Sequence, residues 1–313
     1  MRTKSIFILA LYVMLWGGIR PARAQQPAAA ASGNAKTAIH AGRLVDVRSG
    51  NVRSNVFIIV ERDRIVEIAD AAPAGATVID LSKYTVVPGL IDCHAHLLGN
   101  PKDQSAMSGL RMSSAQGAIW GVHNLEIWLA HGFTALRDAG EADAGYGQLA
   151  LRNSVEKGLI RGPRIVSAGN FVTVTGGHGD SDLLASDKSL PPAPNVANTV
   201  DQVSNAVRRD IKFGADWIKL MATGGVMDPI SDYTVQELSE EQMAKAVEVA
   251  HRAGKKVMAH AEGREGIKAA VRAGVDSIEH GTVLDEEGAK MMEKQGTWLV
   301  PTLYCFQHDM ETG

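Results

Sequence analysis

The chain has 313 residues, of which 45% are hydrophobic and 21% are charged, and its formal net charge at pH 7 is −3. This length allows one large α/β domain or two ordinary domains with an ample core. The near-balanced charge, with no basic stripe and no acidic tail, argues against nucleic acid as a partner and against a solvating arm.

Residues 1–24 have the pattern of a secretory signal peptide. Arg2 and Lys4 give a positive start, and Ile6–Trp16 is an apolar run too short to span a bilayer. Ala22 and Ala24 are small residues at the positions that a signal peptidase reads, so we expect cleavage after Ala24. The sequence therefore predicts a secreted or periplasmic protein without a stable membrane anchor. An uncleaved anchor is the alternative.

Residues 25–36 are rich in Ala and contain Pro, Ser and Gly, which predicts a flexible linker. Residues 37–86 change to short β-type runs bounded by Gly, Asp, Asn and Pro, and we expect a small β domain there. The runs occupy residues 38–47, 55–60, 64–69 and 77–81.

Residues 87–313 alternate strand-like runs with helical stretches, which is typical of a parallel sheet covered by helices. The clearest helix is expected at Glu240–Ala253, with Ser239 as its N-cap and Gly254 after its end. Helices that end at a glycine before a strand are typical of repeated βα units. Seven strands are expected, at residues 90–96, 133–140, 164–170, 215–221, 255–261, 275–281 and 297–303.

A closed (β/α)8 TIM-type barrel needs eight strands. The seventh expected strand is followed by only ten residues, Tyr304–Gly313. The sequence therefore allows an open doubly wound sheet, or an incomplete barrel in which only about seven strands are present and strand eight is missing. The polar residues at the strand ends favour the barrel.

Histidines stand at the ends of three of these strands. His94 and His96 are two residues apart, so both imidazoles face one side of a strand and can reach one ion. His260 and His280 each close a short apolar strand before a glycine-containing turn. Each histidine alone is compatible with a core position, but four of them at one end of the barrel indicate a site for zinc or a similar metal.

Lys219 lies inside an apolar strand pattern, where an ammonium group is costly to bury unless it is paired or modified. One interpretation is a lysine that extends its charge to solvent from a strand end. The other is a lysine carboxylated by carbon dioxide. The two oxygens of the resulting carbamate can each bind one metal ion.

These motifs resemble the amidohydrolase superfamily, and specifically its carboxylysine-bridged two-metal branch. The segment VVPGLIDCHAH at residues 86–96 is very close to the opening PGxIDxHxH motif of that family, and the match runs from about Thr37 to the C-terminus. FTALRDAG at residues 133–140 further resembles the Xaa-Pro dipeptidase-like and imidazolonepropionase-related enzymes of this branch.

The resemblance implies a role for each of these residues. His94 and His96 would bind the more buried metal, carboxylated Lys219 would bridge both metals, and His260 and His280 would bind the second. The last ligand of the family is an aspartate after strand eight, which is also its general base. This sequence has no such position, and Asp309 follows strand seven too soon to replace it.

We therefore expect two divalent metal ions, with zinc as the metal, and a metal-bridging hydroxide that attacks a carbonyl carbon. The expected reaction is hydrolysis of the amide bond of a dipeptide or an N-acyl amino acid. His178, on a glycine-rich loop, is the expected catalytic residue, with a hydrogen bond to the tetrahedral intermediate. Tyr233 is expected to bind a substrate carboxylate. The sequence leaves open whether the protein forms a homo-oligomer.

Four further residues carry structural expectations. Arg137 and Asp138 are expected to form an ion pair that supports the metal site. Cys93 and Cys305 are expected to be small buried thiols without a disulfide bond.

The alternatives belong to different classes. A cyclic-amide hydrolase or a deaminase of the same superfamily would use the same fold, although deaminases typically use one metal and lack the bridging lysine. An inactive truncated chain is the non-enzymatic alternative, because seven strands leave an unpaired edge. Two metal ions per chain would support the dipeptidase-like hydrolase, and one would support the deaminase or cyclic-amide hydrolase. Solubility tests the inactive truncated chain.

Overall fold

The computed structural model describes residues 36–103, 106–188, 190–191, 193–226, 228, 230–304 and 307. The expected signal peptide, the linker up to residue 35, Cys305 and Asp309 lie outside the described residues. The chain divides into two compact units, Met1–Pro88 and Gly89–Gly313. Within the described part, no helix combines the length and the hydropathy that crossing a membrane requires.

The first unit is a four-stranded sheet in the order β3-β2-β1-β4. Strand β1 pairs antiparallel with β2 and parallel with β4. The buried residues Ala41, Val56 and Ile58 form its core, because alternate side chains of β1 and β2 face the same side. The strands are β1 (Lys36–Val45), β2 (Val52–Glu61), β3 (Arg64–Ala69) and β4 (Thr77–Val86).

In the described residues, the second unit contains the seven expected strands and one more, the two-residue strand β8. The strands form a three-stranded sheet, β5-β6-β7, and a five-stranded sheet, β12-β11-β10-β9-β8, and every pairing is parallel. The strands are β5 (Leu90–Ala95), β6 (Phe133–Asp138), β7 (Arg164–Ser167), β8 (Phe171–Val172), β9 (Trp217–Met221), β10 (Lys256–Ala261), β11 (Ser277–His280) and β12 (Trp298–Val300).

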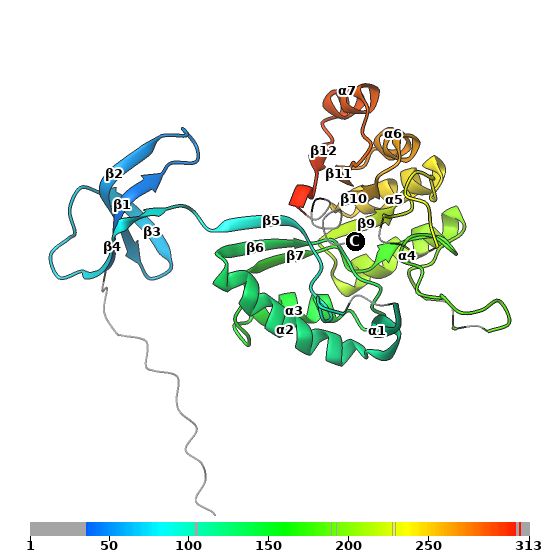
Figure 1. Ribbon diagram of the computed structural model, residues 1–313, viewed down its shortest axis with the longest axis horizontal. Helices are drawn as coiled ribbons and strands as arrows, with labels where there is room; N and C mark the ends of the chain where they lie inside the picture. Colours follow the sequence, from blue (N-terminus) through cyan, green and yellow to red (C-terminus); the bar gives the residue numbers. More distant parts are fainter. Residues whose placement is uncertain are drawn as a thin grey trace, which may run out of the picture. The chain divides into compact units, whose positions relative to one another are not determined.

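Helices follow most of these strands, and Figure 1 shows them on the outer side of the two sheets. Parallel strands that alternate with covering helices give the second unit a TIM-barrel-like α/β arrangement. The helices are α1 (Ala106–Arg111), α2 (Ser114–Ala130), α3 (Gly147–Glu156), α4 (Val200–Phe213), α5 (Glu240–Arg252), α6 (Arg264–Ala273) and α7 (Glu286–Gln295).

The expected helix after strand β9 is confirmed at both ends. The Ser239 side chain accepts a hydrogen bond from the backbone N–H of Gln242, and the Gln242 side chain reaches back to the backbone of Ser239. This reciprocal capping box satisfies two backbone N–H groups at the start of α5. The helix ends at Arg252, and Gly254 follows in the left-handed region with φ 70°.

The chain passes from one sheet to the other between β7 and β8. Gly169 has φ 74°, and Asn170 forms an isolated parallel bridge with Glu141, so the strand direction continues across a local break. Strand β8 then pairs with β9, where Phe171 lies opposite Lys219. Because of this break, β7 ends at Ser167, before the end of the single strand that was expected at residues 164–170.

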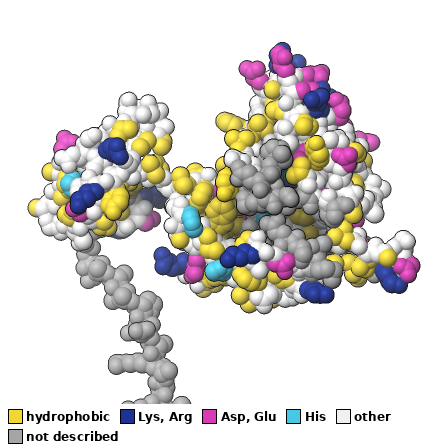
Figure 2. Space-filling view, viewed as in Figure 1, with side chains coloured by type: hydrophobic (Ala, Val, Ile, Leu, Met, Phe, Trp, Pro, Cys, Tyr) yellow, Lys and Arg dark blue, Asp and Glu magenta, His cyan; other side chains and the backbone are white. Residues whose placement is uncertain are grey.

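Two apolar clusters hold the helices to the strands. One lies between β9–β11 and helices α4–α6, and the other lies between β5, β6 and helices α2 and α3. The outer surface is charged in both signs: on the face in Figure 2, acidic and basic side chains interleave over α7. Lys290 of that helix pairs with Glu286 at 2.6 Å. The packed clusters leave the carboxyl ends of the strands free to carry polar groups.

Candidate metal centre at the strand ends

The four strand-end histidines lie together in the structure. The ring centroids of His94 and His280 are 4.7 Å apart, and those of His260 and His280 are also 4.7 Å apart. The rings of His94 and His96 are separated by 5.3 Å. Residues from β5, β10 and β11 therefore converge, because parallel barrel strands end at the same face.

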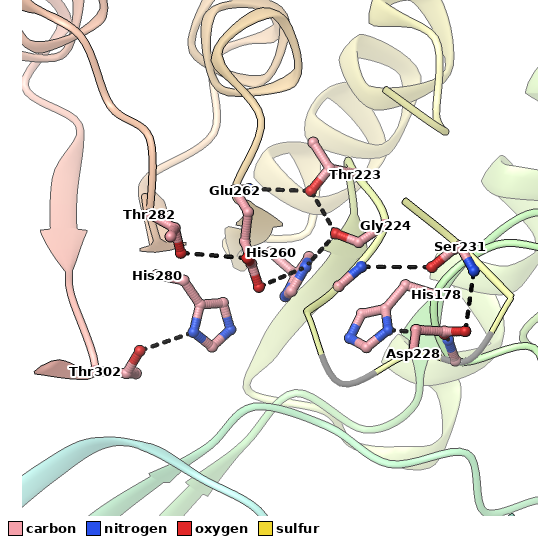
Figure 3. A network of polar contacts seen from close by, with 12 residues as sticks. His178, Thr223, Gly224, Asp228, Ser231, His260, Glu262, His280, Thr282 and Thr302 are labelled. Atoms are coloured by element: carbon pink, nitrogen blue, oxygen red, sulfur yellow. Dashed lines mark hydrogen bonds and ion pairs between the residues drawn. The ribbon is translucent and has the colours of Figure 1, made fainter. Parts of the chain in front are cut away.

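His178 joins this group from the loop after β8. Its ring centroid lies 4.4 Å from that of His260, and Figure 3 shows the rings of His178, His260 and His280 turned toward one another. His280 reaches the cluster through an unusual backbone, with φ 70°. A non-glycine residue in that region is strained, so this strand end is held by its surroundings rather than by local preference.

Lys219 lies on β9 and is 1% exposed. Within the described part of the chain, its Nζ has no hydrogen-bond partner and no carboxylate within 4.0 Å. Burial, as the largest cause, lowers the pKa of Lys219 to about 8. Its charge also lowers the pKa of each strand-end histidine, which places it among them. A buried lysine without a partner is costly unless it is modified or bound to something.

The imidazoles at this site favour the neutral form. Burial, followed by the charge of Lys219, lowers the pKa of His94 well below its ordinary value and also lowers that of His96. Burial, with the charges of His94 and Lys219, lowers the pKa of His280 to about 2. Burial is again the first cause for His260, whose pKa falls well below 6.5. Neutral imidazole is the form that binds metals.

One nitrogen of each ring already has a partner. His94 Nδ1 lies 2.8 Å from Glu279 Oε2, and His96 Nδ1 lies 2.8 Å from the Gly140 carbonyl oxygen. His260 Nε2 donates to the Gly224 carbonyl oxygen at 2.9 Å. A neutral ring that donates from one nitrogen carries a lone pair on the other, so these contacts prepare the second nitrogen as a ligand.

A carboxylate group adjoins His96. Ligand atoms of His96, Asp138 and Glu141 all lie within 4.8 Å of one another, which is a suitable spacing for a metal ion. Burial raises the pKa of Asp138 to about 7 and that of Glu141 to about 8. The imidazole nitrogens and the carboxylates form a donor set that fits divalent metal ions. Solvent reaches His96 from a cavity of about 440 Å³.

Both the ring and the backbone of His178 contact acidic side chains. Its Nδ1 lies 3.0 Å from Asp228 Oδ2, and its backbone N–H donates to both oxygens of Glu237 at 2.9 Å (Figure 3 shows the contact with Asp228). Asp228 Oδ1 in turn accepts from the backbone N–H groups of Ile230 and Ser231. Burial lowers the pKa of His178, although Asp228 opposes this effect.

Tyr233 is the one expected site residue that no described interaction connects to the cluster. It lies half-buried on the loop between β9 and α5, and its role in substrate binding stays a prediction.

Two structural expectations were wrong. Arg137 does not pair with Asp138, because neighbouring residues on a strand point to opposite sides. Instead Arg137 Nη2 donates to Glu279 at 2.7 Å, and Asp138 accepts from Ser167 Oγ at 2.5 Å. Cys93 is exposed rather than buried, since β5 is an edge strand of its three-stranded sheet.

Sequence reasoning missed three carboxylates near the histidines: Glu141, Asp228 and Glu279. Glu279 carried a usable signal. It is a charged residue inside a short run expected to form a buried strand, as Lys219 is. Asp228 had no comparable signal, because it lies in a polar loop where aspartate is common.

A model of the amidohydrolase family matches residues 85–312. Among curated proteins, ochratoxinase of Aspergillus niger is 31% identical over 286 residues, covering 85% of this chain and 58% of that protein. An imidazolonepropionase of a Methylobacterium species is 26% identical over 270 residues, covering 76% of this chain and 62% of that protein. The chain thus spans about 60% of the length of these relatives.

Solved structures give the same result for the fold. A Xaa-Pro dipeptidase with bound methionine in its active site is 35% identical, with a TM-score of 0.78, and the match covers 86% of this chain and 67% of that one. The ochratoxinase of A. niger is 29% identical in structure-based comparison, with a TM-score of 0.74 and coverage of 89% and 67%. These likenesses confirm the TIM-barrel-like fold that the strand-end residues favoured over a doubly wound sheet.

Proposed function

Because this chain belongs to the amidohydrolase family, we propose that it is a metal-dependent hydrolase of amide bonds in dipeptides or N-acyl amino acids. The similarity to a Xaa-Pro dipeptidase and to ochratoxinase supports an amide substrate. We further propose that the protein is secreted or periplasmic, from the pattern of residues 1–24.

One observation carries this proposal: four strand-end imidazoles lie together, and the charge of a buried lysine that has no partner in the described residues acts on each of them. His94 and His96 would hold one zinc ion, and His260 and His280 would hold a second. Carboxylated Lys219 would bridge them, since carboxylation replaces a costly buried cation with an anionic oxygen donor. Divalent cations bound there would supply an activated water and a polarised carbonyl group.

The other residues would position the substrate and control its hydrogen bonds. His178 contacts Asp228 and lies next to His260, and it would hydrogen-bond the substrate carbonyl oxygen as negative charge develops on it. Tyr233, on the loop after β9, is our candidate for contact with a substrate carboxylate.

The test of this function is a lysine replacement. We expect zinc and bicarbonate together to give the protein activity on a panel of Xaa-Pro dipeptides and N-acyl amino acids. Lys219→Ala should lose this activity and part of its zinc, and added formate or propionate should restore some of both. Lys268→Ala, which removes a lysine on α6 that is paired with Glu287, is the control and should retain activity. Unchanged activity in Lys219→Ala would contradict the bridging role.

A cyclic-amide hydrolase is the second candidate, because imidazolonepropionases are among the relatives. Adding cyclic amides to the same substrate panel separates the two. Preference for a cyclic amide over every dipeptide and N-acyl amino acid would replace the first candidate with the second.

A further inference from the structure

Glu279 precedes the strand-end residue His280 on β11 and is completely buried. Its two carboxyl oxygens accept four contacts. Arg137 Nη2 donates to both oxygens, at 2.7 and 2.9 Å, and Ser277 Oγ donates to Oε1 at 2.6 Å. The remaining contact joins Oε2 to His94 Nδ1 at 2.8 Å. A buried carboxylate with this many donors is fully satisfied, so it holds its position.

Arg137 is held just as firmly. Its Nε donates to the Cys93 carbonyl oxygen at 2.6 Å, and its guanidinium lies 4.6 Å from the centre of the Trp217 ring. Arg137 comes from β6 and Glu279 from β11, and β6 and β11 belong to different sheets. The pair therefore links the two sheets directly beneath the strand ends, and neither partner can turn away without breaking several contacts.

These contacts decide which nitrogen of His94 carries hydrogen. A carboxylate that faces a guanidinium and a hydroxyl donor acts as an acceptor, so His94 Nδ1 must donate to it. A neutral imidazole has one N–H, and the lone pair is then on Nε2. The His94 ring also lies beside the rings of His96 and His280, at 5.3 and 4.7 Å.

We propose that Glu279 is a positioning residue that fixes the Nδ1–H tautomer of His94 and thereby reserves Nε2 for a divalent cation. Arg137 is the anchor of Glu279. The tautomer follows from the geometry alone, whereas its consequence for catalysis rests on the proposed function. The competing explanation is that the Arg137–Glu279 pair only joins the two sheets and that its contact with His94 has no effect on the ring.

Replacement of Glu279 by glutamine tests the tautomer. In Glu279→Gln the amide oxygen would stay with Arg137, and the amide NH2 would face His94. His94 Nδ1 would then have to accept, and its hydrogen would move to Nε2. We expect imidazole 15N spectra of the metal-free protein to show Nδ1–H for His94 in the wild type and Nε2–H in the variant. The His94 signals are assigned by comparison with His94→Gln.

Zinc binding provides the second readout. Equilibrium dialysis should show affinity for zinc at the site lowered by about 10–100-fold in Glu279→Gln, the usual cost of losing a partner of a metal-binding histidine. Asp210→Asn is the matched control, because Asp210 is also a buried carboxylate but contacts Tyr146 and Asn170 rather than a strand-end histidine. The control should bind zinc like the wild type.

Each result decides the proposal. An Nε2–H tautomer of His94 in the wild type, or wild-type zinc affinity in Glu279→Gln, would overturn it. If Glu279→Gln does not fold, Glu279→Asp keeps a carboxylate acceptor and should keep the Nδ1–H tautomer, and an Nε2–H tautomer of His94 in that variant would overturn the proposal. A wild-type protein without hydrolytic activity would reject the proposed function, but the tautomer measurement would still decide the role of Glu279.

Discussion

At the scale of single residues, the site consists of imidazoles whose orientation other groups control. The partner of His94 is a carboxylate on a distant strand, and the partners of His96 and His260 are backbone carbonyl oxygens. Burial keeps the rings of His94 and His260 neutral at physiological pH, which suits metal binding. The chemistry of the site therefore depends on residues that need not touch a substrate.

Asp228 gives a prediction about a residue that orients an imidazole. Asp228 contacts His178 Nδ1, so in the proposed role of His178 the other ring nitrogen, Nε2, would be the one that meets the substrate. Asp228→Asn should then lower kcat by about 10–100-fold with a smaller change in KM. Zinc content should not change, because Asp228 contacts none of the expected metal ligands. Steady-state kinetics and metal analysis measure both effects.

The control for this variant is Asp232→Asn on the same loop, where Asp232 caps Thr234 and makes no described contact with His178. Equal losses of kcat in the two variants would mean that loop order, rather than the orientation of His178, explains the effect.

Asp210 gives a prediction about pH. Burial raises its pKa to about 7, although hydrogen bonds from Tyr146 and Asn170 oppose this. The folded state therefore binds more protons than the unfolded state between about pH 4 and 7, so this group's contribution to stability is lost as pH rises through that range. Over this pH range, Asp210 changes the free energy of unfolding by at most about 4 kcal/mol.

Asparagine at this position cannot ionise, so the stability of Asp210→Asn relative to the wild type should increase from pH 4.5 to pH 7.5. Urea unfolding at the two pH values measures the change. A relative stability that is equal at both values would show that Asp210 does not titrate in this range.

At the scale of elements, glycines set where helices end and strands begin. Gly274 ends α6 with φ 91° and leads into β11, which carries Glu279 and His280. Its N–H bonds to carbonyl oxygens of the last helical turn, which closes the helix. The direction in which β11 enters the barrel therefore depends on this turn.

Replacing glycine by alanine should have opposite effects at two positions. Gly274→Ala should lower the free energy of unfolding by about 1–2 kcal/mol, because a Cβ in the left-handed region is strained. Gly117 lies inside α2, where a new Cβ would meet only Leu98 and Met112 at ordinary distances of 3.7 Å or more. Gly117→Ala should raise the free energy of unfolding by about 0.5–1 kcal/mol. Denaturant unfolding of both variants measures these changes. A lower free energy of unfolding in both variants would contradict the expected stabilisation by Gly117→Ala.

At the scale of the whole molecule, the candidate metal centre takes residues from both sheets of the second unit. His94 and His96 come from β5 and its end, whereas Lys219, His260 and His280 come from the five-stranded sheet. Ions bound by residues of both sheets would join them at the strand ends, as Arg137 and Glu279 join them below. Metal binding should therefore stabilise the fold of this unit.

Zinc should raise the temperature of thermal unfolding. At a free concentration 100 times the Kd, binding adds about 2.7 kcal/mol, which corresponds to about 5–10 °C in a domain of this size. Scanning calorimetry of the metal-free protein with and without zinc measures the shift. Lys219→Ala should show a smaller shift, and an equal shift in the variant would place the zinc elsewhere.

The sequence by itself determined the strands, the capped helix α5 and the positions of the strand-end histidines and Lys219. These features follow from local rules: alternation along a strand, capping residues, and polar residues where an apolar run ends. The metal-binding and catalytic roles given to these residues stay predictions.

Only the tertiary structure decided which side chains support the site. Arg137 and Glu279 are 142 positions apart, and His178 and Asp228 are 50 apart, so no local pattern could pair them. The sequence favoured Arg137 with its neighbour Asp138, but the pleat of β6 sends the two side chains to opposite sides. Such pairings depend on how strands are placed in the sheets, and burial then makes each partner necessary, because an unpaired charge there would be costly.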